Sequence, residues 1–142
     1  MKIEAVRKFH FCAGHRVYMH ESKCANIHGH NYVLLAYAQA EELDPLGRVI
    51  DFTILKEKIG SWIDENWDHT FLIFKKDKEM KRLEPMIPKT KPWFICDFNP
   101  TAEMMATYLL KEVCPKVLKG TGVIIKKIEL WETENCKVVV KV

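Results

Sequence analysis

Two histidines separated by a single glycine carry the clearest chemical signal of the sequence. His28 and His30 open a segment rich in Tyr, Val and Leu, which predicts a strand. Side chains two residues apart on a strand point to the same face, so both imidazoles can reach one ion. Catalytic zinc sites commonly take three protein ligands and keep a fourth position open. His15, just after the first alternating segment, is the natural third ligand, although ordinary surface or core histidines would produce the same pattern.

Cys24 lies four residues before His28, and three roles are open to it. Close to a divalent cation, its thiol can lose a proton more easily and act as a base or nucleophile. It can instead be a fourth ligand that closes a structural metal site, or an inert buried thiol. The inert role is the interpretation for the other four cysteines, which are Cys12, Cys96, Cys114 and Cys136.

Three further carboxylates can have either a functional or a structural role. Asp68 is adjacent to His69 and can set the tautomer and basicity of that imidazole, although the pair also fits a helix-end cap. Glu132 continues the apolar face of a predicted strand beyond its end, where a carboxylate faces either solvent or a ligand. Glu103 falls in the first turn of a predicted helix, where an acid is favourable by about 0.3–1 kcal/mol.

The elements that must hold these residues follow from hydrophobic periodicity. Asp51 or Thr53 is expected to cap the first helix. The strand pairs at both ends of the chain lack a crossover helix, which favours antiparallel pairing. The predicted strands are 2–13, 27–40, 94–98, 123–131 and 137–142, and the predicted helices are 53–66 and 102–114.

The most irregular part of the chain is 75–92, which contains seven Lys or Arg and three Pro. We interpret this stretch as a solvated surface segment. Capture of phosphate groups by its basic side chains is the alternative.

Length and composition limit the possible classes of protein. The 142 residues fit one domain, 1–142, and a hydrophobic fraction of 48% argues against disorder. The net charge of +3 is too mild for a dedicated nucleic-acid binder but suits a small anionic substrate. No apolar run approaches a membrane span, and five cysteines without a C-x-x-C pair or a signal peptide favour a reducing cytoplasm. We therefore expect a cytoplasmic protein with no nucleic-acid or membrane partner.

Taken together, these segments resemble the superfamily of 6-pyruvoyl-tetrahydropterin synthase and 6-carboxytetrahydropterin synthase. The resemblance implies an α+β tunnelling fold, in which an antiparallel four-stranded sheet carries two helices on one face. It also implies a trimeric barrel and a homohexamer made of two stacked trimers, with the active site between subunits. The matching segments, in the order of the family, are 11–15, 24–32, 49–56, 68–72, 100–103 and 132–133.

The resemblance also implies roles for individual residues. A pterin edge carries adjacent N–H groups, which one carboxylate can accept together. Because the family's site lies between subunits, Glu103 is a candidate to serve a neighbour's pocket. The implied roles are Zn²⁺ ligation by His15, His28 and His30, proton transfer by Cys24, a base or acid pair of Asp68 and His69, and pterin binding by Glu132 and Glu103 with Thr101 close by.

The implied reaction is that of a lyase acting on 7,8-dihydroneopterin triphosphate. Zinc would act as a Lewis acid on the substrate side chain, and triphosphate would leave. The 6-carboxy branch also releases acetaldehyde and feeds deazapurine synthesis, of queuosine or archaeosine, whereas the pyruvoyl branch keeps the side chain. The three residues between Cys24 and His28 match the 6-carboxy group, because animal-type pyruvoyl enzymes typically have a longer gap.

Two alternatives remain beside a 6-carboxytetrahydropterin synthase. One is a pyruvoyl-type synthase, or a folate-linked lyase acting on dihydroneopterin phosphates. The other is a catalytically silent module that binds pterin or purine, which the joint presence of Cys24, Asp68 and His69 disfavours. The sequence departs from the family pattern at Gly14 and Ala102, and its Lys-rich stretch 75–92 is longer than usual.

Overall fold

The central strands form where apolar residues alternate with polar ones. In the computed structural model, which describes residues 1–142, Phe9, Phe11 and Ala13 of the first strand are buried, while Lys8 and His10 between them are exposed. Alternation of this kind lays one face of a strand on the core. The strands are β1 Ala5–His15, β2 His28–Ala40, β3 Thr70–Phe74, β4 Phe94–Cys96, β5 Val123–Thr133 and β6 Cys136–Lys141.

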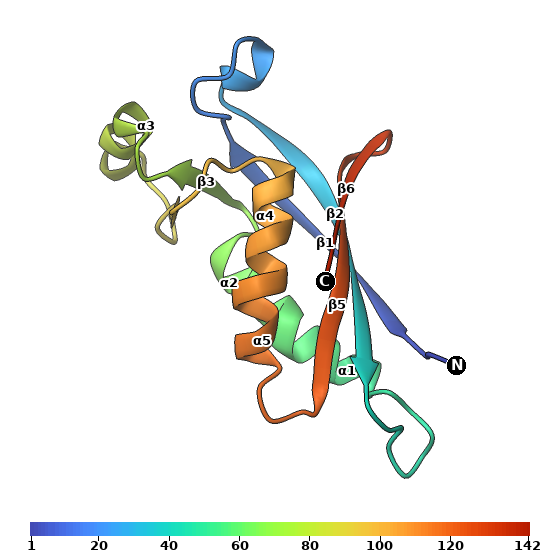
Figure 1. Ribbon diagram of the computed structural model, residues 1–142. Helices are drawn as coiled ribbons and strands as arrows, with labels where there is room; N and C mark the ends of the chain where they lie inside the picture. The colour runs from blue at the N-terminus through green and yellow to red at the C-terminus, as the bar shows by residue number, and fades with distance from the viewer.

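These strands form one mixed sheet in the order β4-β3-β1-β2-β5-β6 (Figure 1). The prediction of a four-stranded antiparallel sheet was therefore wrong, although β1, β2, β5 and β6 do pair antiparallel. β3 joins β1 in parallel over only three residue pairs, and β4 joins β3 in parallel over three more. Four of the five residues of β3 are apolar, and the adjacent Leu72 and Ile73 are both buried, so the strand shows no alternation and periodicity gave no signal there.

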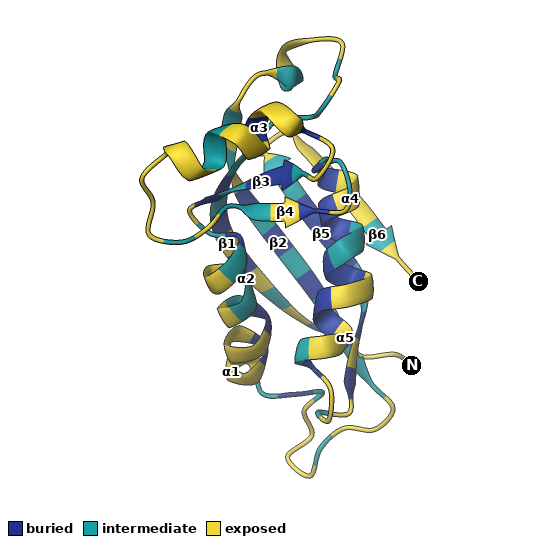
Figure 2. Cartoon of the chain, turned by 90° about the vertical axis from the view of Figure 1, so that its left-hand side faces the viewer, coloured by how far each residue is buried: buried dark blue, intermediate teal, exposed yellow.

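Two long helices lie on one face of the sheet, as expected, and a short third helix was not predicted (Figures 1 and 2). Each long helix is continuous and contains a five-residue π turn at its middle. Asp51 caps the first one, because its side chain accepts a hydrogen bond from Thr53 N at 2.8 Å. The segments are α1 Phe52–Leu55, π turn Lys56–Gly60 and α2 Ser61–Asn66, then α4 Ala102–Tyr108, π turn Leu109–Val113 and α5 Cys114–Val117.

The Lys-rich stretch is folded rather than irregular. It contains helix α3, Lys78–Leu83, followed by a 3-10 turn at Glu84–Met86. The buried carboxylate of Asp77 caps α3 through Met80 N and accepts two hydrogen bonds from Arg16, at 2.7 and 2.6 Å. Paired bonds of this kind are among the strongest in proteins. They fasten α3 to the residue that follows the end of β1.

The core fills the space between the sheet and the two long helices. Its central side chains come from both layers and are fully buried: Leu34, Ile59, Met105, Leu109 and Ile128. The opposite face of the sheet carries no helix. Glu129 lies on that face, where it accepts hydrogen bonds from the hydroxyl of Tyr37 and the ammonium of Lys137. This carboxylate is therefore part of an ion-pair network of the sheet.

We expect Gly14→Ala to destabilise the protein. A Cβ at Gly14 would lie 2.2 Å from a ring carbon of Phe71, and that ring is held against Trp93 with centroids 5.0 Å apart. This clash can be relieved only if the packed ring moves. The free energy of unfolding, measured by urea titration, should therefore fall by about 1–3 kcal/mol. Gly60→Ala is the matched control, because its Cβ would make ordinary contact with Phe9 at 3.5 Å.

A double variant tests the cause of that loss. If the Phe71 ring is the obstacle, Gly14→Ala combined with Phe71→Leu should lose clearly less stability than the sum of the two single variants. Strictly additive losses would contradict this explanation.

Candidate metal centre and active site

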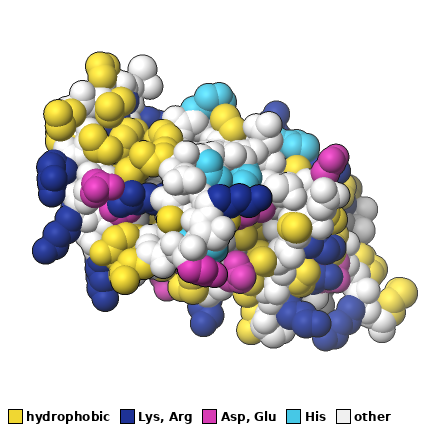
Figure 3. All heavy atoms as spheres, turned by 90° about the horizontal axis from the view of Figure 1, so that it is seen from above, with side chains coloured by type: hydrophobic (Ala, Val, Ile, Leu, Met, Phe, Trp, Pro, Cys, Tyr) yellow, Lys and Arg dark blue, Asp and Glu magenta, His cyan; other side chains and the backbone are white.

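Three histidines meet on one face of the sheet, at the end where β1 and β2 join. His15 pairs directly with His28 across the two strands, and His30 pairs with Ala13 two residues further along. The ring centroids lie 4.7 Å (His15–His28), 5.3 Å (His15–His30) and 5.0 Å (His28–His30) apart. Their possible ligand atoms all lie within 4.8 Å of one another. Figure 3 looks onto this end, where histidine side chains reach the surface beside basic ones.

The imidazoles are oriented so that free nitrogens remain for a ligand. Nδ1 of His15 donates to the carbonyl of Pro100 and Nδ1 of His28 to that of Asn26, both at 2.7 Å. Because a carbonyl only accepts, Nε2 of each ring keeps a lone pair. Nε2 of His30 is buried without any hydrogen-bond partner. An orphaned buried nitrogen beside two tethered rings is the arrangement that a divalent metal ion would satisfy.

Burial keeps two of these imidazoles neutral. Burial lowers the pKa of His15 to about 4, helped by repulsion from His28 and His30 and opposed by the bond to Pro100. Burial also lowers the pKa of His30, although the nearby charge of Glu132 acts in the opposite direction. Metal ions bind neutral imidazole, so His15 and His30 fit a metal without first releasing protons near neutral pH.

Glu132 and Tyr32 complete this end of the sheet. The carboxylate of Glu132 lies 3.4 Å from Nε2 of His30 and is partly exposed. The hydroxyl of Tyr32 lies 3.4 Å from Nε2 of His15, and burial together with the charge of Glu132 raises the pKa of this tyrosine. Tyr32 was not among the predicted site residues. Its position two residues after His30, on the same strand face, was the available signal.

Asp68 and His69 lie apart from the three histidines, where the chain leaves α2 for β3. Asp68 Oδ1 accepts a hydrogen bond from Cys12 N at 2.9 Å, and His69 N donates to Cys12 O at 2.7 Å. Nδ1 of His69 lies 2.9 Å from Asp68 Oδ2. Partial burial raises the pKa of Asp68, but the bonds from Cys12 and His69 outweigh it and the pKa is lowered. The carboxylate thus ties the helix end to β1 instead of capping the helix.

His69 has an unusual backbone. Its φ of 58° lies in the left-handed region, which few residues other than glycine adopt. Its side chain is 78% exposed. The turn therefore presents the imidazole to the outside, with the carboxylate of Asp68 behind it.

Cys24 belongs to neither of these groups within one chain. It lies in a 3-10 turn, Lys23–Ala25, of the connection between β1 and β2, and its carbonyl accepts from Val17 N at 2.9 Å. Thr101 caps α4, because its hydroxyl accepts from Met104 N at 3.2 Å. Glu103 is exposed in the first turn of α4.

The other cysteines differ in their surroundings. Burial raises the pKa of Cys96 and of Cys114 to about 12, in agreement with inert thiols. Cys136 is exposed and Cys12 is half-buried, so the expectation of buried thiols was wrong for both.

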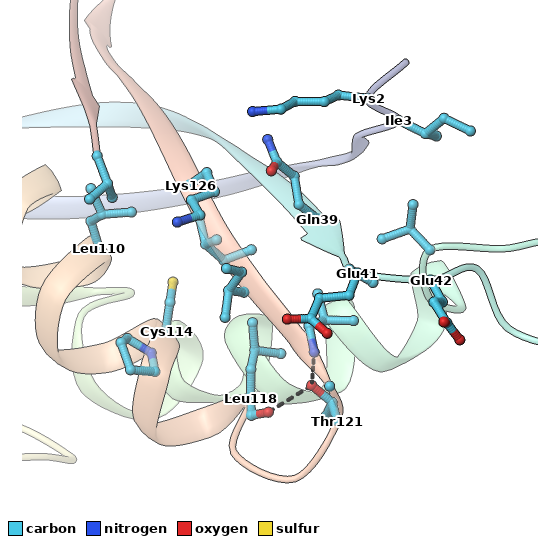
Figure 4. Close-up of a pocket in the computed structure, with 18 of the residues that line it drawn as sticks. Lys2, Ile3, Gln39, Glu41, Glu42, Leu110, Cys114, Leu118, Thr121 and Lys126 are labelled. Atoms are coloured by element: carbon cyan, nitrogen blue, oxygen red, sulfur yellow. Dashed lines mark hydrogen bonds between the residues drawn. The ribbon is translucent and has the colours of Figure 1, made fainter.

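A large hollow lies at the opposite end of the sheet, with a volume of about 1370 Å³ (Figure 4). Residues such as Lys2, Gln39, Glu41, Leu110 and Cys114 line it, and no histidine does. Volume alone would place a ligand there. The neutral histidines and the paired carboxylate, which are the groups suited to chemistry, lie elsewhere.

Comparison with known proteins gives consistent matches along the chain. A family model described as 6-pyruvoyl tetrahydropterin synthase matches residues 4–142. A relative from Rickettsia felis is named 6-carboxy-5,6,7,8-tetrahydropterin synthase and is 41% identical over 94% of this chain and 96% of its own. A relative of the same name from Aquifex aeolicus is 31% identical over 96% of each chain.

Solved structures share the fold. An uncharacterized protein from Wolinella succinogenes superposes with a TM-score of 0.84 at 23% identity, over 99% of this chain and 98% of that chain. A 6-pyruvoyl tetrahydropterin synthase from Caenorhabditis elegans superposes with a TM-score of 0.70 at 24% identity, over 100% and 96%. None of the helices is long and apolar enough to cross a membrane.

We expect the metal-free protein to lose stability in acid through His15. The pKa of this histidine is about 4 in the folded protein and 6.5 in the unfolded chain. Between these values the unfolded chain binds more protons, so the free energy of unfolding should fall as the pH is lowered from 6.5 to 4, by at most about 3 kcal/mol. Above pH 6.5 this contribution is fully present.

Urea unfolding in the presence of a chelator at pH 7, 5.5 and 4 measures this dependence. His15→Gln removes the titrating group, so the variant should show a shallower pH dependence than the original protein, whatever its stability at pH 7. Parallel pH profiles for the two proteins would contradict the assignment.

Proposed function

Because the chain belongs to the 6-pyruvoyl tetrahydropterin synthase family, we propose that it is a zinc-dependent 6-carboxy-5,6,7,8-tetrahydropterin synthase. It would convert 7,8-dihydroneopterin triphosphate to 6-carboxytetrahydropterin, with release of triphosphate and acetaldehyde, and supply deazapurine synthesis. The names of the relatives and the three-residue gap between Cys24 and His28 favour this branch. The observation that carries the proposal is the buried Nε2 of His30, which has no hydrogen-bond partner, beside the two tethered imidazoles.

His15, His28 and His30 would hold the zinc ion through nitrogens that the protein leaves free. A zinc ion bound there supplies a Lewis acid that polarises the hydroxyls of the substrate side chain. Pro100 and Asn26 orient two of the ligands through their carbonyls. Such outer contacts fix the ring positions before the ion arrives.

Glu132 would orient the pterin ring. Its carboxylate can accept two adjacent N–H groups of the pterin edge, and its position beside His30 brings the substrate side chain toward the histidines. The buried hydroxyl of Tyr32 keeps its proton and can donate one further hydrogen bond at the floor of the site. Thr101 already caps α4, so we assign it the positioning of the helix end that carries Pro100 and Glu103.

Proton transfer would fall to Cys24 and to the pair of Asp68 and His69. Asp68 accepts a hydrogen bond from Nδ1–H of His69, which leaves a lone pair on Nε2 that can take a proton and later return it. The thiol of Cys24 would exchange a proton with the substrate side chain. Because one chain does not gather Cys24 with Asp68 and His69, we propose that two copies of the chain complete one site.

The edges of the sheet favour such an assembly. β3 pairs with β1 only at Ala13–His15, so the earlier part of β1 has a free edge, and β6 has no partner beyond β5. Free edges of long strands are templates for pairing with another chain. We propose that β1 of one copy pairs with β6 of the next, which closes a trimeric barrel, and that two trimers stack into a homohexamer. Exposed Glu103 and His69 would then face neighbouring chains.

The family model itself keeps a second candidate, a 6-pyruvoyl tetrahydropterin synthase. It would use the same residues but retain the whole substrate side chain. A module that only binds pterin would have no use for the hydrogen-bonded pair of Asp68 and His69.

Product analysis distinguishes these candidates. The purified protein, loaded with one zinc per chain, is incubated with 7,8-dihydroneopterin triphosphate, and the pterins are identified by mass spectrometry. We expect 6-carboxytetrahydropterin with acetaldehyde and triphosphate in equal amounts. A pyruvoyl product would select the second candidate, unchanged substrate would select a binding module, and full activity without metal would contradict the zinc mechanism.

Mixed assemblies test whether the site is shared. Cys24→Ala and His69→Asn should each abolish turnover, and Cys24→Ala should keep its zinc. When the two variants are unfolded and refolded together, roughly a quarter of shared sites would combine an intact Cys24 with an intact His69, so activity should return to a comparable fraction. Recovery no greater than for each variant refolded alone would place both residues in one chain's own site, and loss of zinc from Cys24→Ala would make that cysteine a ligand.

A further inference from the structure

A second group of metal-binding side chains lies on the other face of β1. Cys12 and His15 are three residues apart on this strand, so their side chains point to opposite faces of the sheet. The thiol of Cys12, a carboxylate oxygen of Asp68 and a ring nitrogen of His69 all lie within 4.8 Å of one another. None of these donors belongs to the three-histidine group.

The backbone holds this second group in place independently of the thiol. The hydrogen bonds from Cys12 N to Asp68 and from His69 N to Cys12 O join the turn to a strand that is paired over its whole length with β2. Nδ1 of His69 already lies 2.9 Å from Asp68 Oδ2, so an ion would take the place of the proton between these two donor atoms. The half-buried thiol and the exposed imidazole leave an approach from solvent.

The donor types select a class of ion. Thiolate, imidazole and carboxylate together suit zinc and similar divalent transition ions, whereas magnesium and calcium prefer oxygen alone. Donors around a tetrahedral zinc ion lie about 3.4–3.8 Å apart, so a small rotation of the exposed His69 ring completes the approach. The charge of the Asp68 carboxylate favours a cation, while the nearby Lys91, which donates to the Asp64 carbonyl at 2.8 Å, opposes it. These opposing charges predict that a divalent ion binds more weakly here than at the three histidines.

We propose that Cys12, Asp68 and His69 bind a second zinc-like divalent ion, and that this ion inhibits the enzyme by occupying the pair that transfers protons. The inhibition rests on the proposed function, whereas the binding does not. Zinc up to one equivalent per chain would then support activity, and zinc beyond it would reduce activity reversibly.

Cobalt reports the second site directly. Untagged protein loaded with one zinc per chain is titrated with Co²⁺ at neutral pH, and the thiolate-to-cobalt charge-transfer band is followed. We expect one further equivalent with that band in the original protein, no band in Cys12→Ser, and an affinity lower by about 10-fold or more in that variant. Cys136→Ser is the matched control for an exposed thiol and should keep the band.

Cys24→Ser distinguishes the two sites. A band that persists in Cys24→Ser and disappears in Cys12→Ser supports the proposal. A band that disappears in Cys24→Ser and persists in Cys12→Ser would assign the thiolate to the histidine site and overturn the proposal, as would the absence of any band.

His69→Asn is the second variant, because asparagine tolerates the left-handed backbone of this position. It should weaken binding of the second equivalent about 10-fold or more and leave the first zinc in place. Unchanged binding in this variant would overturn the assignment of the imidazole as a ligand.

Activity separates the two halves of the proposal. Added Zn²⁺ should lower turnover of the original protein and should lower it much less in Cys12→Ser, each compared with the same protein at one zinc per chain. Cobalt binding without inhibition by zinc would overturn the inhibitory role alone. If the protein does not convert the pterin at all, the proposed function fails while the cobalt result still decides whether the second site exists.

Discussion

The register of β1 against β2 is the constraint on which the rest of the structure depends. Pairing of His15 with His28 brings three imidazoles to one end and one face of the sheet. Because side chains alternate along a strand, a slip by one residue would move His15 to the opposite face and separate it from the other two. The salt bridge from Arg16 to Asp77 and the bond from His15 to Pro100 secure the same strand end from two directions.

β1 serves two chemical environments through its two faces. On the helix-covered face, burial removes charge and keeps histidines neutral and ready for a metal. At the edge of β1 beside the turn before β3, the backbone N–H of Cys12 stabilises the charge of Asp68. Neutral imidazoles and an ionised carboxylate therefore lie close together along β1, because one side of this strand is buried and the other is open to solvent.

The sequence alone predicted the features that depend on local pattern. The long strands, the two long helices, the Asp51 cap and the closeness of His28 and His30 follow from periodicity, capping chemistry and spacing. β3 escaped prediction because it is held by three residue pairs with β1 and three with β4 and shows no alternation, whereas β4 lies within the predicted strand 94–98. Helix α3 escaped prediction because its capping residue, Asp77, is held by hydrogen bonds from Arg16, sixty-one positions earlier. The hydrogen bond from Cys12 N to Asp68 also joins distant parts of the sequence. The sequence alone could not show it, so Asp68 and His69 resembled a helix cap.

The left-handed backbone of His69 carries a consequence for engineering this fold. Glycine or asparagine would relieve the local strain, and such replacements commonly stabilise a protein when the native φ is positive. A search for thermostable variants would therefore favour the loss of this imidazole and, with it, of the hydrogen bond to Asp68. Under the proposed role of His69 in proton transfer, selection for heat resistance alone would enrich well-folded, catalytically silent chains, so any such library needs a parallel screen for turnover.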